Sequence, residues 1–323
     1  MAVMNAMILD EQNNFKWAEV EKFVPKADEV LIKVAAAAIN RADLLQKDGQ
    51  YPSPPEWPQW CGLEVSGTVE SAPAGSHLQV GDKVCALLGG GGYSEYVTVP
   101  QGMVVPIPEK MDIVHAAGLP EVWSTVYLNL VYEAGGLKPG EVFFVQAGAS
   151  GVGLAAIQLA KTMGAKVVTT VGSDEKVSFV KSIGADIAVN YHKEDIRAVL
   201  HANPPSVALD CVSGSSLGGY LEEMAFGGRW VVIASMAGKD TMVDLSNLFR
   251  KRLKLIGSTL RSRTNEEKTR IMKALYDELW PLFTAGKLVN NIYAIYPITE
   301  VEAAHSVLRR NENIGKVLLS FQN

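Results

Sequence analysis

The stretch Ala147-Gly148-Ala149-Ser150-Gly151-Val152-Gly153 follows an apolar run, Val142–Val145, and precedes a helical pattern at Leu154–Ala160. A strand, a tight glycine turn and a helix N-terminus in this order bring backbone N–H groups and the positive end of a helix dipole against a pyrophosphate. A second apolar run, Lys166–Val171, then ends at Gly172-Ser173, where the ribose of the nucleotide would lie. The stretch therefore predicts a nucleotide-phosphate cradle.

The composition predicts an ordinary globular protein. Of its 323 residues, 48% are hydrophobic and 20% are charged, which suits one or two domains with a large core. The formal net charge is -5 and the densest basic cluster is Arg250-Lys251-Arg252, which argues against nucleic acid as the main partner. Three cysteines at unpaired spacing indicate a reducing compartment. No segment has the length of a membrane span or the pattern of a signal peptide, so we expect a cytoplasmic protein without membrane contact.

The chain divides into two parts with different sequence patterns. The first third contains strand-like segments separated by Gly and Pro clusters, at Val30–Val34, Glu64–Val69 and Gly92–Val99. From about Glu121, helical patterns alternate with apolar strands, which is typical of a doubly wound parallel sheet. These strands are expected at Glu141–Gln146, Lys166–Val171, Ile187–Asn190, Val207–Asp210, Trp230–Ala234 and Leu253–Ser258.

The C-terminal segment has too little apolar sequence for a core of its own. An amphipathic helix is expected at Thr264–Thr284, and helical spacing recurs from Ile298 to Leu308 before a last strand at Lys316–Ser320. We expect this segment to return to the N-terminal lobe, giving two domains with a cleft between them. The expected parts are the β-rich lobe at residues 1–121, the nucleotide domain at 122–263 and the returning segment at 264–323.

The end of the second strand of the nucleotide domain predicts NADP rather than NAD. An NAD site usually places a carboxylate here to accept a hydrogen bond from the ribose 2′-hydroxyl. This strand instead runs into Gly172-Ser173 with Lys176 one turn further on, and a hydroxyl with an ammonium suits a 2′-phosphate. Asp174 and Glu175 lie close by, although a helix dipole also favours acids in a first turn. Ser173 can cap the following helix and still contact phosphate.

The sequence does not show the spacing of a metal site. Cys61, Cys85 and Cys211 are isolated, and the five histidines never pair at ligand spacing. We therefore expect no metal. Any reduction would depend on positioning and hydrogen bonding, with hydride supplied by the cofactor.

A polar segment before a Pro-rich loop is the second candidate site. Asn40 and Asp43 interrupt an apolar run, and Tyr51 lies in the loop Gly49–Pro55. Asn40 and Asp43 could cap the short helix that includes Leu44-Leu45, or they could take part in catalysis. Tyr51 could pack as an aromatic, or its phenol could hydrogen-bond a substrate oxygen as negative charge develops. The residues leave both alternatives open.

Further motifs extend over nearly the whole chain. They are Ile39–Gln46 with Tyr51-Pro52, Gly62–Gly67, Gly81–Val84, Gly92–Tyr96, Leu119–Val122, Ala147–Gly153, Gly257–Arg263 and Ile314–Val317. Together they resemble the zinc-independent medium-chain dehydrogenases/reductases, specifically the quinone oxidoreductases of the zeta-crystallin type and the tumour-suppressor-inducible subgroup among them. Two departures from the pattern are Ser150 in place of the middle glycine of G-x-G-x-x-G, and Trp57 and Trp60 in a loop that varies within the family.

The resemblance implies an α/β protein with a GroES-like β-rich catalytic domain, a Rossmann domain, NADPH as reductant and a homodimer joined through the Rossmann sheets. It places Asn40 and Tyr51 at the substrate with Asp43 in support, and Asn40 stands where zinc-dependent relatives carry a cysteine ligand. It assigns four groups of residues to the cofactor. They are Ser150, Gly151, Val152 and Gly153 at the pyrophosphate; Gly172, Ser173, Lys176 and Tyr191 at the 2′-phosphate; Thr125 at the nicotinamide; and Ile233, Ala234, Ser235, Met236, Leu260, Arg261 and Ser262 along the nicotinamide half.

The resemblance also implies a function. We expect an NADPH-dependent quinone oxidoreductase that works without a metal in the interdomain cleft, and release of semiquinone is compatible with such a site. One alternative is NADPH-dependent reduction of activated C=C bonds in enals or enones, which needs the same oxygen-stabilising groups. The other is a non-enzymatic, crystallin-like NADPH-binding protein.

Overall fold

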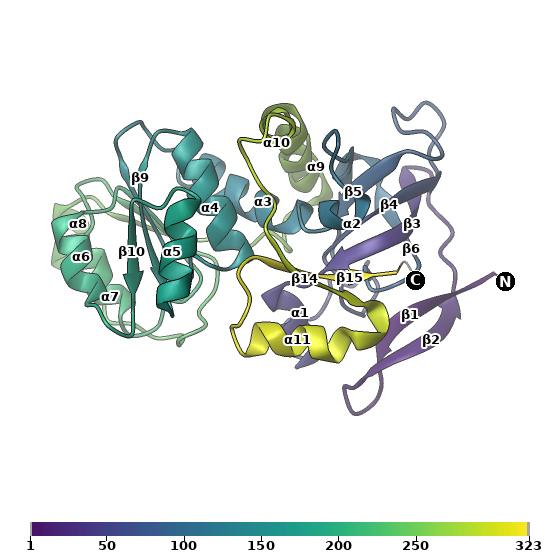
Figure 1. The fold of residues 1–323 in the computed structure, drawn as a ribbon, viewed down its shortest axis with the longest axis horizontal. Helices are drawn as coiled ribbons and strands as arrows, with labels where there is room; N and C mark the ends of the chain where they lie inside the picture. The colour runs from purple at the N-terminus through teal and green to yellow at the C-terminus, as the bar shows by residue number, and fades with distance from the viewer. Residues whose placement is uncertain (1, 322–323) are drawn as a thin grey trace. The chain divides into compact units, whose positions relative to one another are not determined.

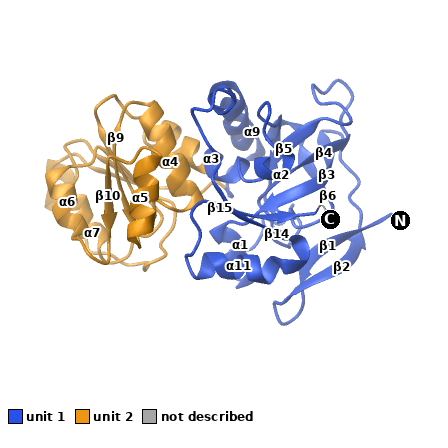
Figure 2. Cartoon of the chain, in the orientation of Figure 1, with its two compact units in different colours: residues 1–124, 261–323 blue, residues 125–260 orange. Residues whose placement is uncertain are grey.

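The computed structural model describes residues 2–321, and these form two compact units (Figures 1 and 2). Unit 1 combines the chain up to Ser124 with the chain from Arg261 onward, and unit 2 is Thr125–Leu260. Among the described residues, every helix is too short or too polar to cross a membrane.

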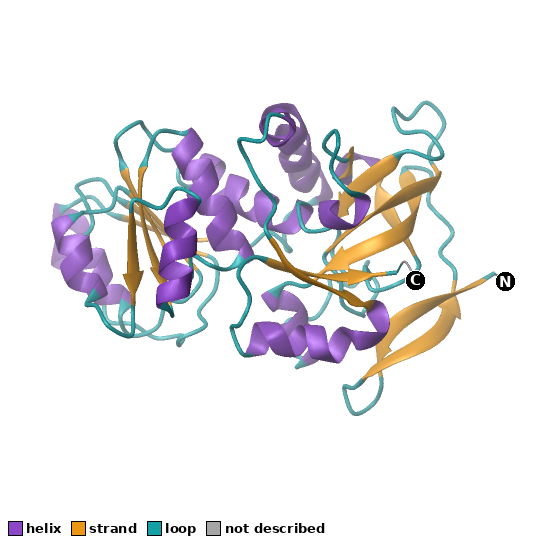
Figure 3. Cartoon of the chain, viewed as in Figure 1, coloured by secondary structure: helices purple, strands orange, loops and turns teal. Residues whose placement is uncertain are grey.

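Unit 2 is built on a parallel sheet with the strand order β10-β9-β8-β11-β12-β13 within residues 125–260. The chain runs from β8 outward to one edge, then crosses back to β11 and continues to the other edge, so the switch point lies between β8 and β11. Helices cover both faces (Figures 1 and 3), which confirms the expected doubly wound α/β class. In chain order the elements are β8 (Val142–Val145), α4 (Gly151–Thr162), β9 (Lys166–Val171), α5 (Asp174–Ser182), β10 (Ile187–Asn190), α6 (Ile196–Ala202), β11 (Val207–Asp210), α7 (Leu217–Glu222), β12 (Arg229–Val232), α8 (Leu245–Arg250) and β13 (Lys254–Gly257).

A row of buried side chains crosses the middle of this sheet. Phe144 of β8 is in register with Val168 of β9 on one side and with Ala208 of β11 on the other, and Ala208 is in register with Trp230 of β12. All four residues are fully buried in one apolar cluster. Because both faces of such a sheet are covered, its central strands are apolar runs, and this is why they could be predicted.

Unit 1 contains a mixed sheet with the order β14-β15-β3-β4-β5-β7, in which β6 also pairs with β3, and a separate pair of strands, β1 and β2. The last strand, β15 (Lys316–Ser320), pairs antiparallel with β3 (Glu29–Ala38), with Leu318 opposite Ala38. The N- and C-terminal parts of the chain therefore share one sheet. The remaining strands are β1 (Val3–Leu9), β2 (Phe15–Glu21), β4 (Glu64–Ser71), β5 (Lys83–Leu87), β6 (Tyr96–Pro100), β7 (Val104–Pro106) and β14 (Ile292–Pro297).

The helices of unit 1 are mostly short. They are α1 (Arg41–Lys47), α2 (Ile113–Ala116), α9 (Asn265–Ala274), α10 (Trp280–Thr284) and α11 (Val301–Arg309), with 3-10 turns η1 (Gln101–Met103) and η4 (Ile298–Glu300). The helix α3 (Pro120–Tyr127) begins in unit 1 and continues into unit 2, where a π-helical turn, η2 (Leu128–Glu133), follows it.

The strand expected at Trp230–Ala234 ends at Val232, and two larger differences from the expected elements concern a strand and a helix of unit 1. The strand expected at Gly92–Val99 is restricted to β6, because the Gly92 and Tyr93 N–H groups donate instead to the carbonyls of Gly62 and Cys61. The single helix expected at Thr264–Thr284 is interrupted by a π-helical turn, η3 (Leu275–Leu279), between α9 and α10. Pro281 in the first turn of α10 has no N–H to donate to the preceding turn, so one α-helical hydrogen bond is missing where η3 meets α10.

Candidate active site

The nucleotide-phosphate turn of unit 2 follows β8, at the switch point of the sheet. A Cβ on Gly148 would lie 2.1 Å from Thr169 Oγ1, and a Cβ on Gly153 would lie 2.4 Å from the Ala147 carbonyl oxygen, so neither position admits a side chain. Ser150 is the N-cap of α4, and its Oγ accepts a hydrogen bond from the Gly153 N–H at 3.0 Å. The turn therefore presents bare backbone at a helix N-terminus.

The residues expected at the 2′-phosphate lie together at the ends of β9 and β10. Ser173 is the N-cap of α5, and its Oγ accepts from the Lys176 N–H at 3.2 Å. The Tyr191 hydroxyl lies against Gly172, where an added Cβ would come within 2.5 Å of it. The N-cap interpretation of Ser173 is thus correct for the structure, and the four residues form one corner of unit 2.

Asp174, the residue after Ser173, is bound by two neighbours. It forms an ion pair with Lys193, and one of its carboxylate oxygens accepts from Asn190 Nδ2 at 2.7 Å. The hydrogen bonds from Lys193 and Asn190 lower the pKa of Asp174. The negative charge beside Ser173 is therefore balanced within the protein.

A buried carboxylate, Asp210 at the end of β11, organises the turns after β11 and β12. Its main-chain carbonyl accepts from the Ile233 N–H at 2.8 Å, and Ser213 Oγ donates to the Ala234 carbonyl at 3.0 Å. These bonds fix the turn that holds Ile233, Ala234, Ser235 and Met236. The side-chain donors to Asp210 are Gln146 Nε2 at 2.9 Å, Trp230 Nε1 at 3.0 Å and Ser213 Oγ at 3.2 Å, with the backbone N–H groups of Val212 at 2.7 Å and Ser213 at 2.8 Å.

The other residues expected at the cofactor fall in different units. Thr125 begins unit 2, and its carbonyl accepts from Asn129 Nδ2 at 2.7 Å. Leu260 ends unit 2 and is buried, whereas Arg261 and Ser262 belong to unit 1. Of these two, Ser262 is exposed and Arg261 is buried.

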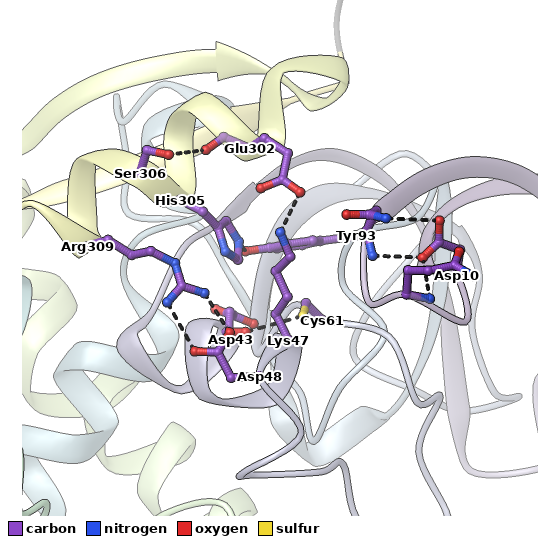
Figure 4. A network of polar contacts seen from close by, with 12 residues as sticks. Asp10, Asp43, Lys47, Asp48, Cys61, Tyr93, Glu302, His305, Ser306 and Arg309 are labelled. Carbon is purple, nitrogen blue, oxygen red and sulfur yellow. Dashed lines mark hydrogen bonds and ion pairs between the residues drawn. The ribbon is translucent and has the colours of Figure 1, made fainter.

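In unit 1, Asp43 caps α1 and ties it to a neighbouring loop. Its Oδ2 accepts from the Asn40 N–H at 2.7 Å, and its Oδ1 accepts from the Gly62 N–H at 2.8 Å. Burial raises the pKa of Asp43 to about 6, although both N–H donors oppose that shift. The capping interpretation therefore describes Asp43. Figure 4 shows Asp43 near two ion pairs to α11, one from Lys47 to Glu302 and one from Asp48, the C-cap of α1, to Arg309.

Asn40 occupies the N-cap position, but its side chain belongs to a buried polar cluster with Glu64 and Lys316. Asn40 Nδ2 donates to Glu64 Oε1 at 3.0 Å, and Lys316 Nζ donates to Asn40 Oδ1 at 2.7 Å. The ion pair between Lys316 Nζ and Glu64 Oε1 measures 2.8 Å, with both side chains buried. Each charge in the cluster is therefore paired and hydrogen-bonded, as burial requires.

Glu121 connects to this cluster through its backbone. Its N–H, in the first turn of α3, donates to Glu64 Oε2 at 2.9 Å. Its own carboxyl is partly exposed and accepts no hydrogen bond from any residue in 2–321. Loss of hydration, followed by the nearby negative charge of Glu64, raises the pKa of Glu121 to about 8.

Arg261 holds the loop that carries Tyr51. The guanidinium is buried, and its carbon lies 4.8 Å from the centroid of the Tyr51 ring. The Tyr51 hydroxyl is partly exposed and has no hydrogen-bond partner in the described part of the chain. Burial raises the pKa of Tyr51, and the Arg261 charge opposes that shift. The acceptors for Arg261 are the carbonyls of Tyr51 at 2.7 Å and Gly89 at 3.0 Å, Gln46 Oε1 at 2.5 Å and Ser53 Oγ at 3.2 Å.

The glycines Gly89–Gly91 pack closely against the same loop. A Cβ on Gly89 would lie 2.4 Å from Trp57 Cδ1, and one on Gly90 would lie 2.2 Å from Ser53 Oγ. Trp57 is buried and Trp60 Nε1 donates to the Gly91 carbonyl at 2.9 Å. The loop with the two tryptophans is therefore packed against bare backbone.

The polar cluster does not fit a metal ion. Between residues 2 and 321, His, Cys, Asp and Glu side chains nowhere gather in groups of three or more that could hold one. Glu64 already shares its Oε1 with the Lys316 ammonium and the Asn40 amide, so the cation of this cluster is a lysine.

Sequence reasoning missed Glu64, Glu121 and Lys316 as site residues. Glu64 and Lys316 each begin a strand whose first four residues are buried, and charged side chains are almost never fully buried unless they are paired. Opposite charges at the starts of two buried strands were the available signal. It would have suggested a pair, without saying which strands are neighbours.

Two family models and several known proteins match this chain. Residues 26–109 match the family model for the alcohol dehydrogenase GroES-like domain, and residues 151–276 match that for zinc-binding dehydrogenase. The chain is 30% identical to quinone oxidoreductase-like protein 2 of Bos taurus over 312 residues, covering 94% of this chain and 89% of the relative. It is 29% identical to the quinone oxidoreductase of Homo sapiens over 303 residues, covering 92% and 90%. The chain therefore belongs to the medium-chain dehydrogenase/reductase family of nicotinamide-dependent oxidoreductases.

Solved structures with a similar fold align with this chain over almost its full length. A mycobacterial protein solved as a complex with NADPH is 26% identical with a TM-score of 0.83, and 98% of this chain and 99% of that chain are covered. The CurK enoyl reductase is also 26% identical, with a TM-score of 0.84 and 98% of both chains covered.

Proposed function

We propose that the chain is an NADPH-dependent quinone oxidoreductase. The observation that carries the proposal is the Tyr51 phenol, which is partly exposed, has no partner among residues 2–321 and is held by the buried Arg261 guanidinium. A positioned donor of this kind stabilises a carbonyl oxygen that gains negative charge during reduction. The names of the relatives at about 30% identity support a quinone as the carbonyl compound.

The turn after β8 fits the pyrophosphate of NADPH. Gly148 and Gly153 let the turn pack closely against Thr169 and the Ala147 carbonyl, and Ser150 satisfies the Gly153 N–H. The N–H groups of Gly151 and Val152 in the first turn of α4 would then face the anion. When bound, NADPH supplies the hydride, and the chain's own residues position the acceptor and its proton.

The corner at Ser173 supports NADPH over NADH. The Ser173 hydroxyl, the Lys176 ammonium and the Tyr191 hydroxyl would contact the 2′-phosphate, with Gly172 leaving space for Tyr191. The carboxylate of Asp174 is paired with Lys193 and bonded to Asn190, which reduces its repulsion of a phosphate.

For the nicotinamide half we propose Thr125, the turn Ile233–Met236, Leu260 and Ser262. We propose a different role for Arg261, because its side chain is fully engaged with the Tyr51 loop. Asn40 is likewise engaged by Glu64 and Lys316, so we propose that it organises the polar cluster, with Asp43 as the cap of α1, while Tyr51 contacts the substrate.

The exposed edge of unit 2 supports a homodimer. Leu255 on the edge strand β13 is 45% exposed, and Leu245 and Phe249 on the adjacent α8 are each 68% exposed. Large apolar side chains gathered at an unpaired strand edge favour association with a second copy. Light scattering after gel filtration tests this: twice the chain mass supports the dimer, and a monomer at micromolar concentration rejects it. Cys61, Cys85 and Cys211 form no disulfide within residues 2–321, which supports a cytoplasmic location.

An acceptor panel separates the quinone proposal from its strongest competitor. Reduction of activated C=C bonds is supported by the likeness to an enoyl reductase. NADPH oxidation should be followed with a set of quinones and a set of enals and enones under identical conditions. A higher kcat/KM for quinones supports the proposal, and a higher value for enals or enones replaces it with the second function. Absence of oxidation with every acceptor would favour a binding protein without catalytic activity.

A further inference from the structure

Reduction by hydride leaves an anion, and that anion needs a proton. A quinone that takes up a hydride becomes a hydroquinone monoanion, and an enone becomes an enolate. Each must then receive one proton, and a side chain positioned to give it contributes typically about 100-fold to 10,000-fold in rate. Tyr51 can donate a hydrogen bond to the oxygen, but its raised pKa makes it a poor net source of protons near neutral pH.

Glu121 has the placement that such a proton source needs. Its backbone N–H is fixed on Glu64 Oε2 at 2.9 Å, and Glu64 in turn holds Asn40 and Lys316. The carboxyl itself is partly exposed and has no hydrogen-bond partner in residues 2–321. The backbone of Glu121 is therefore fixed beside the cluster, while its carboxyl oxygens stay available.

We propose that Glu121 is the proton donor of this site. Its carboxyl gives its proton to the oxygen of the reduced acceptor, so that one hydride and one proton convert a quinone to a hydroquinone, and solvent then reprotonates the carboxylate. The proposal rests on the proposed reductase function. It holds for a quinone or an enone, because either anion requires one proton per hydride.

The surrounding charges keep that proton in place near neutral pH. Loss of hydration and the negative charges of Glu64 on β4 and Asp43 on α1 raise the pKa of Glu121 to about 8. The opposing cations are Lys316 on β15 and Arg261, and both are already bound, Lys316 to Glu64 and Arg261 to neutral acceptors of the Tyr51 loop. The two further groups whose charges interact with Glu121 are Tyr51 and Lys268 of α9, which donates to the Arg261 carbonyl at 2.9 Å.

The test compares the pH dependence of turnover in matched variants. Glu121→Gln keeps the shape of the side chain and removes its proton, and Glu121→Asp restores an acid. The same exchange at an exposed position of unit 1, Glu109→Gln, is the control. For each protein, kcat and kcat/KM with one quinone should be measured from about pH 6 to about pH 10, together with the affinity for NADPH.

In the wild type we expect turnover to fall above about pH 8 as one group loses its proton. Glu121→Gln should lose this pH-dependent step, turn over at least about 100-fold more slowly at pH 7 and bind NADPH normally. Glu121→Asp should recover part of the rate with the step displaced, and Glu109→Gln should match the wild type.

Equal turnover and an unchanged pH profile in Glu121→Gln would overturn the proposal while leaving the reductase function in place. If Glu121→Gln does not fold, the pH profile of Glu121→Asp is the deciding measurement. If turnover of Glu121→Asp falls at the same pH as in the wild type, the titrating group is another residue and the proposal is overturned. If the wild type oxidises NADPH with none of the acceptors, the reductase function fails first and the role of Glu121 fails with it.

Discussion

Lys316 Nζ lies 2.8 Å from Glu64 Oε1 although the two residues, on β15 and β4, are far apart in the sequence. The strand β3 lies between these two strands in the sheet. The Asn40 amide bridges the pair from the N-cap of α1, which links the start of this helix to the two strands. The C-terminal strand therefore supplies the positive charge that allows Glu64 to be buried.

Removing Lys316 should destabilise the protein strongly. Lys316→Met would leave the buried Glu64 carboxylate without its cation, which costs about 3–5 kcal/mol of unfolding free energy. Equilibrium urea denaturation measures this value. Lys287→Met, at an exposed position, should change it by less than about 0.5 kcal/mol. A loss below about 1 kcal/mol in Lys316→Met would mean that Glu64 is not charged and buried as the structure has it.

Replacing Arg261 should affect the Tyr51 loop and leave the cofactor site intact. Arg261→Lys keeps the charge but cannot reach the four acceptors of the guanidinium, so we expect a loss of about 2 kcal/mol or more in stability. It should also lower kcat with a quinone, while NADPH affinity stays as in the wild type. Arg310→Lys, on the exposed surface, is the matched control. Weaker NADPH binding with an undisturbed kcat would instead assign Arg261 to the cofactor.

Lys176→Ala should weaken NADPH and spare NADH. Loss of the ammonium at the 2′-phosphate corner is expected to reduce NADPH affinity at least about tenfold, which equals about 1.4 kcal/mol. Fluorescence titration with both dinucleotides measures the change. Lys181→Ala, an exposed lysine in the last turn of the same helix, should bind both as the wild type does. An equal loss for NADPH and NADH would show that Lys176 does not read the 2′-phosphate.

Glu121→Gln should stabilise the fold at alkaline pH. The pKa of Glu121 is raised in the folded state from 4.5 to about 8, so ionisation of this carboxyl favours the unfolded chain. Below pH 4.5 the carboxyl is protonated in both the folded and the unfolded state, and stability is complete. As the pH rises from 4.5 to about 8, the free energy of unfolding falls because the unfolded chain ionises first. The variant should therefore gain stability over the wild type across this range, measured by urea denaturation at several pH values. Glu109→Gln should show no such trend, and a parallel pH dependence of variant and wild type would refute the raised pKa.

The parallel sheet of unit 2 could be predicted because its central strands, β8, β9 and β11, are buried on both faces. The expected strands at Lys166–Val171, Ile187–Asn190 and Val207–Asp210 coincide with β9, β10 and β11. The glycine turn at Ala147–Gly153 was recognisable for a related reason, since backbone that must approach a neighbour closely excludes side chains. These features depend on local sequence.

The polar cluster of unit 1 could not be predicted in this way. The pairing of Glu64 with Lys316 depends on which strands become neighbours, and the sequence pattern does not contain that information. The orientation of Asn40 was open for the same reason, because an N-cap residue can turn its amide toward its helix or toward another element. The break at η3 and the loss of strand at Gly92 likewise follow from tertiary contacts and from proline chemistry.

Turnover of a quinone by NADPH in the wild type and in Tyr51→Phe tests the central claim most directly. The substitution removes only the phenol oxygen, and that oxygen has no partner to lose among the described residues. We expect kcat to fall at least about 10-fold to 100-fold in Tyr51→Phe, with NADPH affinity retained and the fold intact. Undiminished turnover in Tyr51→Phe, or a wild type that leaves NADPH unoxidised in the presence of quinones, would contradict the account.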